Sequence, residues 1–290
     1  MQKTERLQAA LQRGVTVRVI VDNGKYQVNT EEQQNLATYV TQNGGQLHLS
    51  NPIFPRSFPK VILIDHMRVL VGSACLDSTT FAQYRDYVYT SNSRGLIKDL
   101  SALFENDWRY SSENGTYFPP FNPTPRLTQK NLLVSPVNSA DRYVAFLQGA
   151  KETLDVTTEL LGNPTLQSEL VAAAQKGVRI RLMAPLLVNS PGPGQQQLQN
   201  ESLAMLSAQG IQVRVTVDPQ TAETPYMHAR TAVRDGKTLF LGSISYSLNS
   251  TTFNREVGLL LKGREAVRRV RDRFELDWRN KSVPLAMALA

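Results

Sequence analysis

The chain contains two copies of one unit, and this internal repeat constrains its fold more than any other feature. The segment Phe104–Arg109, FENDWR, returns in the second half of the chain as Phe274–Arg279, FELDWR. The same offset relates Gly72-Ser73 to Gly242-Ser243, and the register holds without a gap from residue 58 to residue 109. Chance matches do not keep one register over so long a stretch, so the sequence predicts two structurally equivalent halves.

Short apolar segments alternate with helical ones in each half. In the first half, five segments are apolar throughout or alternate in period two, and we expect them to form strands. They are residues 15–21, 46–49, 61–64, 69–71 and 87–90. Helices are expected over Leu7–Leu11 and Leu170–Ala174, each followed by a glycine where helices often end. The pattern predicts the α/β class, with two pseudo-symmetric lobes that each contain a mixed β-sheet flanked by helices.

The two halves differ at their beginnings. The second half opens with an expected strand over residues 132–136, a helix over 140–150 and a strand over 153–159, which have no counterpart in the first half. Either the chain is a fragment of a longer protein, or the fold tolerates a shortened first lobe. For this reason the sequence does not predict a localisation, and both a soluble and a peripheral membrane protein remain open.

Proline-rich segments suggest where the lobes end. We assign residues 1–116 to the first lobe, 117–130 to a linker and 131–290 to the second lobe, because Tyr117–Pro125 contains four prolines and cannot form a regular helix. A second stretch rich in Pro, Gly and Gln, residues 189–197, predicts a long loop within the second lobe.

Composition narrows the classes of function. The single cysteine, Cys75, excludes an internal disulfide framework, and three histidines argue against a multi-histidine zinc site. No apolar run approaches the roughly 20 residues that span a bilayer, so no integral membrane segment is expected. The net charge of +7 favours anionic partners, namely an anionic phospholipid, another phosphodiester or a nucleic acid.

A set of polar residues in the second half indicates phosphodiester chemistry. In chain order these residues are His228, Arg230, Asp235, Gly242, Ser243, Asn254 and Glu256. Phosphodiester cleavage needs a nucleophile, a proton donor for the leaving oxygen and cations for the phosphoryl oxygens. Histidine can fill either of the first two roles near neutral pH, and arginine can bind phosphate with two parallel hydrogen bonds. Such a site requires neither a metal nor another cofactor.

This set resembles the signature of the phospholipase D superfamily, His-x-Lys-x4-Asp-x6-Gly-Ser followed by Asn-x-Glu, with Arg230 in place of the lysine. The resemblance extends over both halves. It implies that the two lobes face each other across a shared active cleft and that each lobe contributes one histidine. One histidine attacks phosphorus and becomes phosphorylated, while the other protonates the leaving group.

The first half departs from this pattern at the expected histidine, because Phe58 occupies the position that the repeat aligns with His228. We predict that His228 and Glu256 are catalytic. The residues predicted to bind phosphate are Lys60, Arg230, Ser73, Ser243 and Asn254. Motif residues predicted to have mainly structural roles are Asp65, Asp235, Asp86, Gly72 and Gly242. Phe58 marks the degenerate catalytic position.

Three functions remain open on these grounds. The first is a phospholipase D-like phosphodiesterase or phosphatidyltransferase that acts on phospholipid at a membrane surface, similar to the bacterial cardiolipin synthase and phospholipase D group. The second is a nuclease of the same superfamily, which the basic charge would suit. The third is a catalytically inactive protein that binds phosphate, which Phe58 favours.

Overall fold

The computed structural model describes residues 9–23, 31–75, 78–116, 122, 125–189, 192–216 and 223–289. The chain divides into two compact units. Unit 1 comprises residues 1–58 and 99–127, and unit 2 comprises residues 59–98 and 128–290. Residues 117–121, 123 and 124 of the expected linker, and residues 7 and 8 of the first expected helix, lie outside the described residues. Residues 9–12 are helical, as expected.

Unit 1 contains a parallel strand pair connected by a helix. Strand β1 (Arg18–Val21) pairs with β2 (Gln46–Leu49), and helix α2 (Glu31–Gln42) lies between them in sequence. A parallel pair requires such a crossover, because a tight turn can join only antiparallel strands. The first strand begins three residues later than predicted, at Arg18, whereas the second strand has the predicted bounds. His48 of β2 stacks on Trp108 at 3.8 Å between ring centroids.

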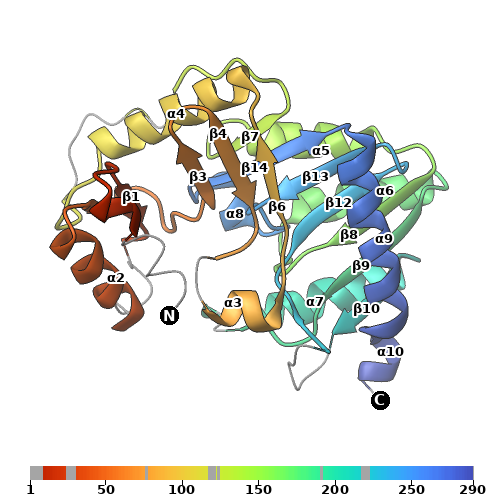
Figure 1. Ribbon diagram of the computed structural model, residues 1–290. Helices are drawn as coiled ribbons and strands as arrows, with labels where there is room; N and C mark the ends of the chain where they lie inside the picture. The colour runs from red at the N-terminus through yellow and green to blue at the C-terminus, as the bar shows by residue number, and fades with distance from the viewer. Residues whose placement is uncertain are drawn as a thin grey trace. The chain divides into compact units, whose positions relative to one another are not determined.

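Unit 2 is built on an eight-stranded mixed sheet (Figure 1). Its strands, in sheet order, are β15 (Val283–Pro284), β10 (Gln212–Thr216), β9 (Arg179–Pro185), β8 (Thr153–Thr157), β12 (Arg230–Arg234), β13 (Thr238–Gly242), β14 (Glu256–Leu261) and β7 (Leu132–Ser135). Strands β8, β9 and β10 run parallel, and β12, β13, β14 and β7 continue the sheet in antiparallel pairs. The predicted mixed sheet flanked by helices is confirmed.

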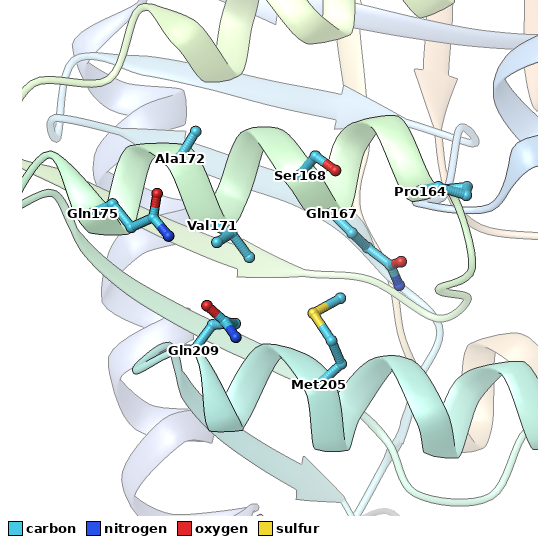
Figure 2. Close-up of a pocket in the computed structure, with 8 residues that line it drawn as sticks. All are labelled: Pro164, Gln167, Ser168, Val171, Ala172, Gln175, Met205 and Gln209. Atoms are coloured by element: carbon cyan, nitrogen blue, oxygen red, sulfur yellow. The ribbon is translucent and has the colours of Figure 1, made fainter.

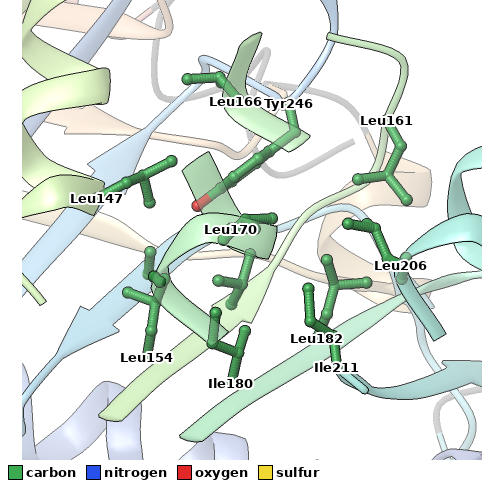
Figure 3. Packing of buried hydrophobic residues seen from close by; sticks show 14 of the residues in the cluster. Leu147, Leu154, Leu161, Leu166, Leu170, Ile180, Leu182, Leu206, Ile211 and Tyr246 are labelled. Carbon is green, nitrogen blue, oxygen red and sulfur yellow. The ribbon is translucent and has the colours of Figure 1, made fainter. Parts of the chain in front are cut away.

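Helices cover both faces of this sheet. On one face lie α5 (Ser139–Gln148), α6 (Pro164–Gln175) and α7 (Gln195–Ala208). Their apolar side chains pack with alternate strand residues such as Leu154 and Leu182 in the main core (Figure 3). On the other face lies α9 (Arg264–Asn280), which contacts β8, β12 and β13 and precedes the short helix α10 (Leu285–Ala288). Side chains alternate along β8 and β9, so Leu154 and Leu182 face this helical layer. On the side of α9 lie the polar Asp155 and Arg181, together with Met183, which packs with Phe274.

Unit 2 also contains the hairpin of the first half. Strands β3 (Val61–Ile64), β4 (Arg68–Gly72) and β6 (Val88–Ser91) form a three-stranded sheet, and β4 contacts β13 and β14. Helix α3 (Ser78–Gln83) precedes the short strand β5 (Tyr84–Arg85), which pairs with β11 (Tyr226–Met227). Helix α4 (Arg94–Arg109) follows β6, and helix α8 (Leu248–Thr252) lies at the second-half position of α3.

The elements of the two halves match at the offset of the sequence repeat. At that offset both ends of β4 coincide with those of β13, and the first residue of α4, Arg94, coincides with the first residue of α9, Arg264. The turns match as well, because Asp65 and Asp235 both have φ of 51°. One prediction is wrong in part: residues 195–197, expected in a loop, form the first turn of α7. Among the described residues, no helix has the length and hydropathy that crossing a bilayer would require.

Candidate active site

His228 is fixed by a residue from the other half of the sequence. Strands β5 and β11 are parallel, with Tyr84 opposite Tyr226 and Arg85 opposite Met227. Continuing this register by one residue places Asp86 next to His228. Both carboxylate oxygens of Asp86 lie 2.9 Å from Nδ1 of His228, and His228 is 7% exposed. A carboxylate on Nδ1 selects the tautomer that leaves Nε2 unprotonated when the ring is neutral.

Glu159 lies on the Nε2 side of the same ring and pairs with Arg230. Glu159 Oε2 is 3.8 Å from His228 Nε2 and accepts a short hydrogen bond from Nη2 of Arg230. Arg230 also donates to the backbone oxygen of His228 at 2.6 Å and to Ser245 Oγ at 3.1 Å. Although burial opposes its charge, the neighbouring carboxylates, Glu159 first among them, raise the pKa of Arg230. The guanidinium is therefore positively charged at the site.

Glu256 is a second buried carboxyl group of the site. Ser250 Oγ donates to one of its oxygens at 2.7 Å, and Asn254 Nδ2 donates to the other at 2.8 Å. Burial raises the pKa of Glu256 to about 7, although these hydrogen bonds and the charges of Arg230 and Lys60 oppose the shift. Glu256 therefore exchanges its proton near neutral pH, as a general acid or base must.

Lys60 brings a cation from the first half of the sequence. Its ammonium Nζ is 2.6 Å from Cys75 Sγ, and its backbone has φ of 50°. The positive charge of Lys60 opposes the rise in the pKa of Glu256, and Cys75 adds to the rise in the pKa of Arg230. The predicted residues Lys60, Asp86, His228, Arg230 and Glu256 are thus brought together within unit 2.

The motif serines and glycines pack strands closely. Ser73 Oγ accepts a hydrogen bond from the backbone N–H of Tyr87 at 3.1 Å, and Ser243 Oγ accepts one from Val257 at 3.1 Å. A Cβ on Gly72 would lie 2.2 Å from the backbone oxygen of Tyr87, and one on Gly242 would lie 2.3 Å from that of Val257, the equivalent residue. The serines thus bind the neighbouring backbone, and Asn254 binds Glu256; their roles as phosphate ligands stay predictions.

The two motif aspartates lie at hairpin turns. Asp235 accepts hydrogen bonds from the backbone N–H groups of Lys151, Glu152 and Thr153 at 2.8 to 3.2 Å. Asp65, its first-half equivalent, is exposed. Phe58 is half-buried in unit 1, where the guanidinium carbon of Arg56 lies 5.7 Å from its ring centroid.

Sequence reasoning missed Glu159 and the hydrogen bond that Tyr226 donates to it. Glu159 lies two residues beyond the end of β8, and Tyr226 begins β11 and donates from its hydroxyl to Glu159 Oε1 at 2.9 Å. The available signal was a buried carboxylate shortly after a buried strand, because acidic residues are rarely buried without a partner.

A separate groove lies between α6 and α7 (Figure 2). It has a volume of about 390 Å³. Its lining residues are Pro164, Gln167, Ser168, Val171, Ala172, Gln175, Met205 and Gln209. None of these eight side chains is titratable near neutral pH or belongs to the motif, so this groove is not the site of the chemistry.

Known proteins resemble this chain in sequence and in fold. The human mitochondrial cardiolipin hydrolase is 28% identical over 141 residues, covering 49% of this chain and 51% of that protein. A probable cardiolipin synthase of Bacillus subtilis is 23% identical over 237 residues, covering 77% of this chain and 46% of that protein. The chain thus spans about half the length of these curated relatives.

The structural and family comparisons extend over most of the chain. The crystal structure of the phosphatidylserine synthase of Haemophilus influenzae matches 97% of this chain and 78% of that one, with a TM-score of 0.69 and 14% identity, which shows a shared fold. The family model described as cardiolipin synthase, PLD-like domain, matches residues 2–108 and 143–278. Because these residues make up most of its length, the chain belongs to this family and, with it, to the phospholipase D superfamily.

Proposed function

We propose that this chain cleaves or transfers the phosphodiester of an anionic phospholipid, with His228 as the nucleophile. One observation supports this more than any other: Asp86 holds Nδ1 of His228 at 2.9 Å, while Nε2 lies 3.8 Å from Glu159 Oε2, the oxygen to which Arg230 donates. A histidine oriented in this way presents an unprotonated nitrogen to an electrophile. The relatives named for cardiolipin hydrolysis and cardiolipin synthesis favour a phospholipid over a nucleic acid as substrate.

In the proposed reaction, Nε2 of His228 forms a bond to phosphorus as the bond to the leaving alcohol breaks. The cations Arg230 and Lys60 stabilise the negative charge on the phosphoryl oxygens. The leaving oxygen takes a proton, and we assign this proton to Glu256, whose pKa of about 7 keeps part of the population protonated at neutral pH. Water or an alcohol then attacks the phosphohistidine and passes its proton to the Glu256 carboxylate while the bond between phosphorus and Nε2 breaks, which gives hydrolysis or transfer respectively.

A second candidate is a phosphate-binding protein without turnover. Phe58 favours it, because this residue stands where the sequence pattern has the other histidine. Loss of one member of a catalytic set costs several orders of magnitude in rate, whereas binding electrostatics survive.

Hydrolysis of a chromogenic phosphodiester, and of cardiolipin in mixed vesicles, separates the two candidates. The parent chain is assayed beside Phe58→His, His228→Ala and the double variant. If the parent turns over and His228→Ala does not, the enzyme function is supported. If the parent is silent and Phe58→His gains activity that depends on His228, the site is intact and Phe58 disables it. Turnover that is unchanged by His228→Ala would refute the proposed nucleophile.

A further inference from the structure

Glu159 lies outside the sequence motif, yet it contacts both of the groups that should meet the substrate. Its Oε2 accepts the short hydrogen bond from Arg230 and lies 3.8 Å from His228 Nε2. Its other oxygen accepts the Tyr226 hydroxyl at 2.9 Å, and the side chain of Glu159 is 10% exposed. The carboxylate is therefore held in place from two sides in a largely buried environment.

The position of this carboxylate is informative because of what a substrate needs there. A nucleophilic Nε2 has to face phosphorus, and an arginine beside it binds a phosphoryl oxygen. A phosphoryl oxygen of the bound substrate must therefore lie close to Nε2 and to the guanidinium at once. Glu159 Oε2 occupies such a position. Resting on the function proposed above, we propose that Glu159 is a specificity-determining residue whose carboxylate holds a negative charge at the phosphoryl-oxygen position, so that the site accepts a singly charged phosphodiester and rejects a doubly charged phosphomonoester.

The charges of the described site agree with this assignment. Lys60 and Arg230 supply two positive charges, and His228 adds a third when it is protonated. Asp86 and Glu159 supply two negative charges, and Glu256 adds a further fraction because its pKa is about 7. With Glu159 ionised, the carboxylates offset the cations, so little positive charge remains for a ligand. Neutralising Glu159 leaves one more positive charge in a buried site, where screening by water is weak.

Tyr226 fixes the carboxylate in this position. Its hydroxyl donates to Glu159 and accepts the backbone N–H of Asn189 at 3.0 Å. Burial, and next the charge of Glu159, raise the pKa of Tyr226, so the hydroxyl keeps its proton and remains a donor. Removal of this hydroxyl leaves the charge of Glu159 but releases one of its two attachments, which lets the carboxylate move away from an incoming phosphate.

The test measures binding of two small anions to the intact chain by titration calorimetry at about pH 8, where inorganic phosphate is mainly a dianion. The second ligand is dimethyl phosphate, which carries one negative charge. Glu159→Gln is expected to raise the affinity for inorganic phosphate at least about tenfold and that for dimethyl phosphate about threefold or less, because like charges at close range are costly. The ratio of the two affinities is the informative readout, since a purely structural defect would change both together.

Two further variants provide a control and a second line of evidence. Glu275→Gln removes an equal charge from α9, where Glu275 pairs with Arg181, and is expected to leave both affinities within about twofold of the parent. Tyr226→Phe is expected to raise the phosphate affinity by a smaller factor than Glu159→Gln, and it decides the matter if Glu159→Gln does not fold. An unchanged affinity ratio, or weaker phosphate binding in the folded variant, would overturn the proposal.

The outcome is separable from that of the proposed function. Binding is measured without turnover, so a chain that binds phosphate and never cleaves a diester would refute the enzyme function and leave the role of Glu159 standing. Conversely, if Arg230→Gln binds both anions as the parent does, then Arg230 is not a phosphate ligand, and both proposals fail.

Discussion

Asp86 and His228 are 142 residues apart in the chain, and both carboxylate oxygens of Asp86 lie 2.9 Å from Nδ1 of His228. The contact joins the first half of the sequence to the second. It places within unit 2 a histidine–carboxylate pair that neither half contains by itself.

We expect Asp86→Asn to lower kcat/KM about 10²- to 10⁴-fold, in the parent or in Phe58→His if the parent is silent. An amide can donate to Nδ1 and thereby favour the wrong tautomer, while the shape of the site is kept. The measurement is steady-state hydrolysis of the chromogenic diester across a range of pH. Asp272→Asn on the exposed side of α9 is the control, since Asp272 interacts with Arg268 and Arg271 there. Activity of Asp86→Asn within a factor of three of its background would show that Asp86 does not orient the nucleophile.

Asp235 and Asp65 occupy equivalent turns, so comparing their substitutions measures how much the hydrogen bonds of Asp235 stabilise the fold. Asp235 accepts three backbone N–H groups of residues 151–153, which lower its pKa despite the opposing effect of its partial burial. We expect Asp235→Asn to reduce the free energy of unfolding by about 1–2 kcal/mol at neutral pH, and Asp65→Asn by less than about 0.5 kcal/mol. Asparagine tolerates the left-handed φ of both turns, so backbone strain cancels in the comparison.

Chemical denaturation of both variants measures this difference. The sign of its pH dependence follows from the lowered pKa of Asp235: the stabilisation is present above the unfolded value of 3.8 and is lost as the pH falls through the lower folded value. Equal losses in the two variants would indicate that the hydrogen bonds to residues 151–153 contribute little.

The sequence allowed prediction of the elements that local pattern and repetition define. Strands β2 and β3 have the predicted bounds, and β4 and α4 have their second-half equivalents at the expected spacing. For Glu159 local pattern offers only a carboxylate near the end of a buried strand. Its place beside His228 and Arg230 depends on the pairing of β8 with β12, where Thr157 lies opposite Thr231. The pairing of β5 with β11 is equally non-local and short, so no periodicity in the sequence indicates it.

The start of α7 was missed because the two residues before it, Pro193 and Gly194, are typical of a loop. In the structure Gly194, at φ of 71°, caps the helix.

A buried arginine beneath α9 makes two ion pairs of different exposure. Arg181 binds Asp155 with hydrogen bonds of 2.7 and 2.9 Å, and it binds Glu275 of α9 at 2.5 Å. The side chain of Asp155 is 6% exposed and that of Glu275 is 34% exposed. We expect Asp155→Asn to lower the free energy of unfolding by about 3 kcal/mol, because it leaves the buried charge of Arg181 poorly compensated. We expect Glu275→Gln to lower it by about 1 kcal/mol or less. Urea denaturation of the two variants measures both values, and the reverse order would contradict this ranking.

Glu256 should make the stability of the protein depend on pH in the opposite sense to Asp235. Burial raises its pKa from 4.5 to about 7 in the folded chain, so between these values the folded state binds more protons than the unfolded state. The stabilisation is complete below the unfolded value, decreases as the pH rises, and is lost above the folded value. The total is on the order of 3 kcal/mol.

We therefore expect Glu256→Gln to remove most of this decrease, so that the variant gains stability relative to the parent at pH 8 but not at pH 5. Glu275→Gln is the control, because Arg181 lowers the pKa of Glu275 and the resulting dependence falls below this window. If the parent and Glu256→Gln lose stability in parallel from pH 5 to pH 8, Glu256 is ionised throughout and cannot be the proton donor in the proposed reaction.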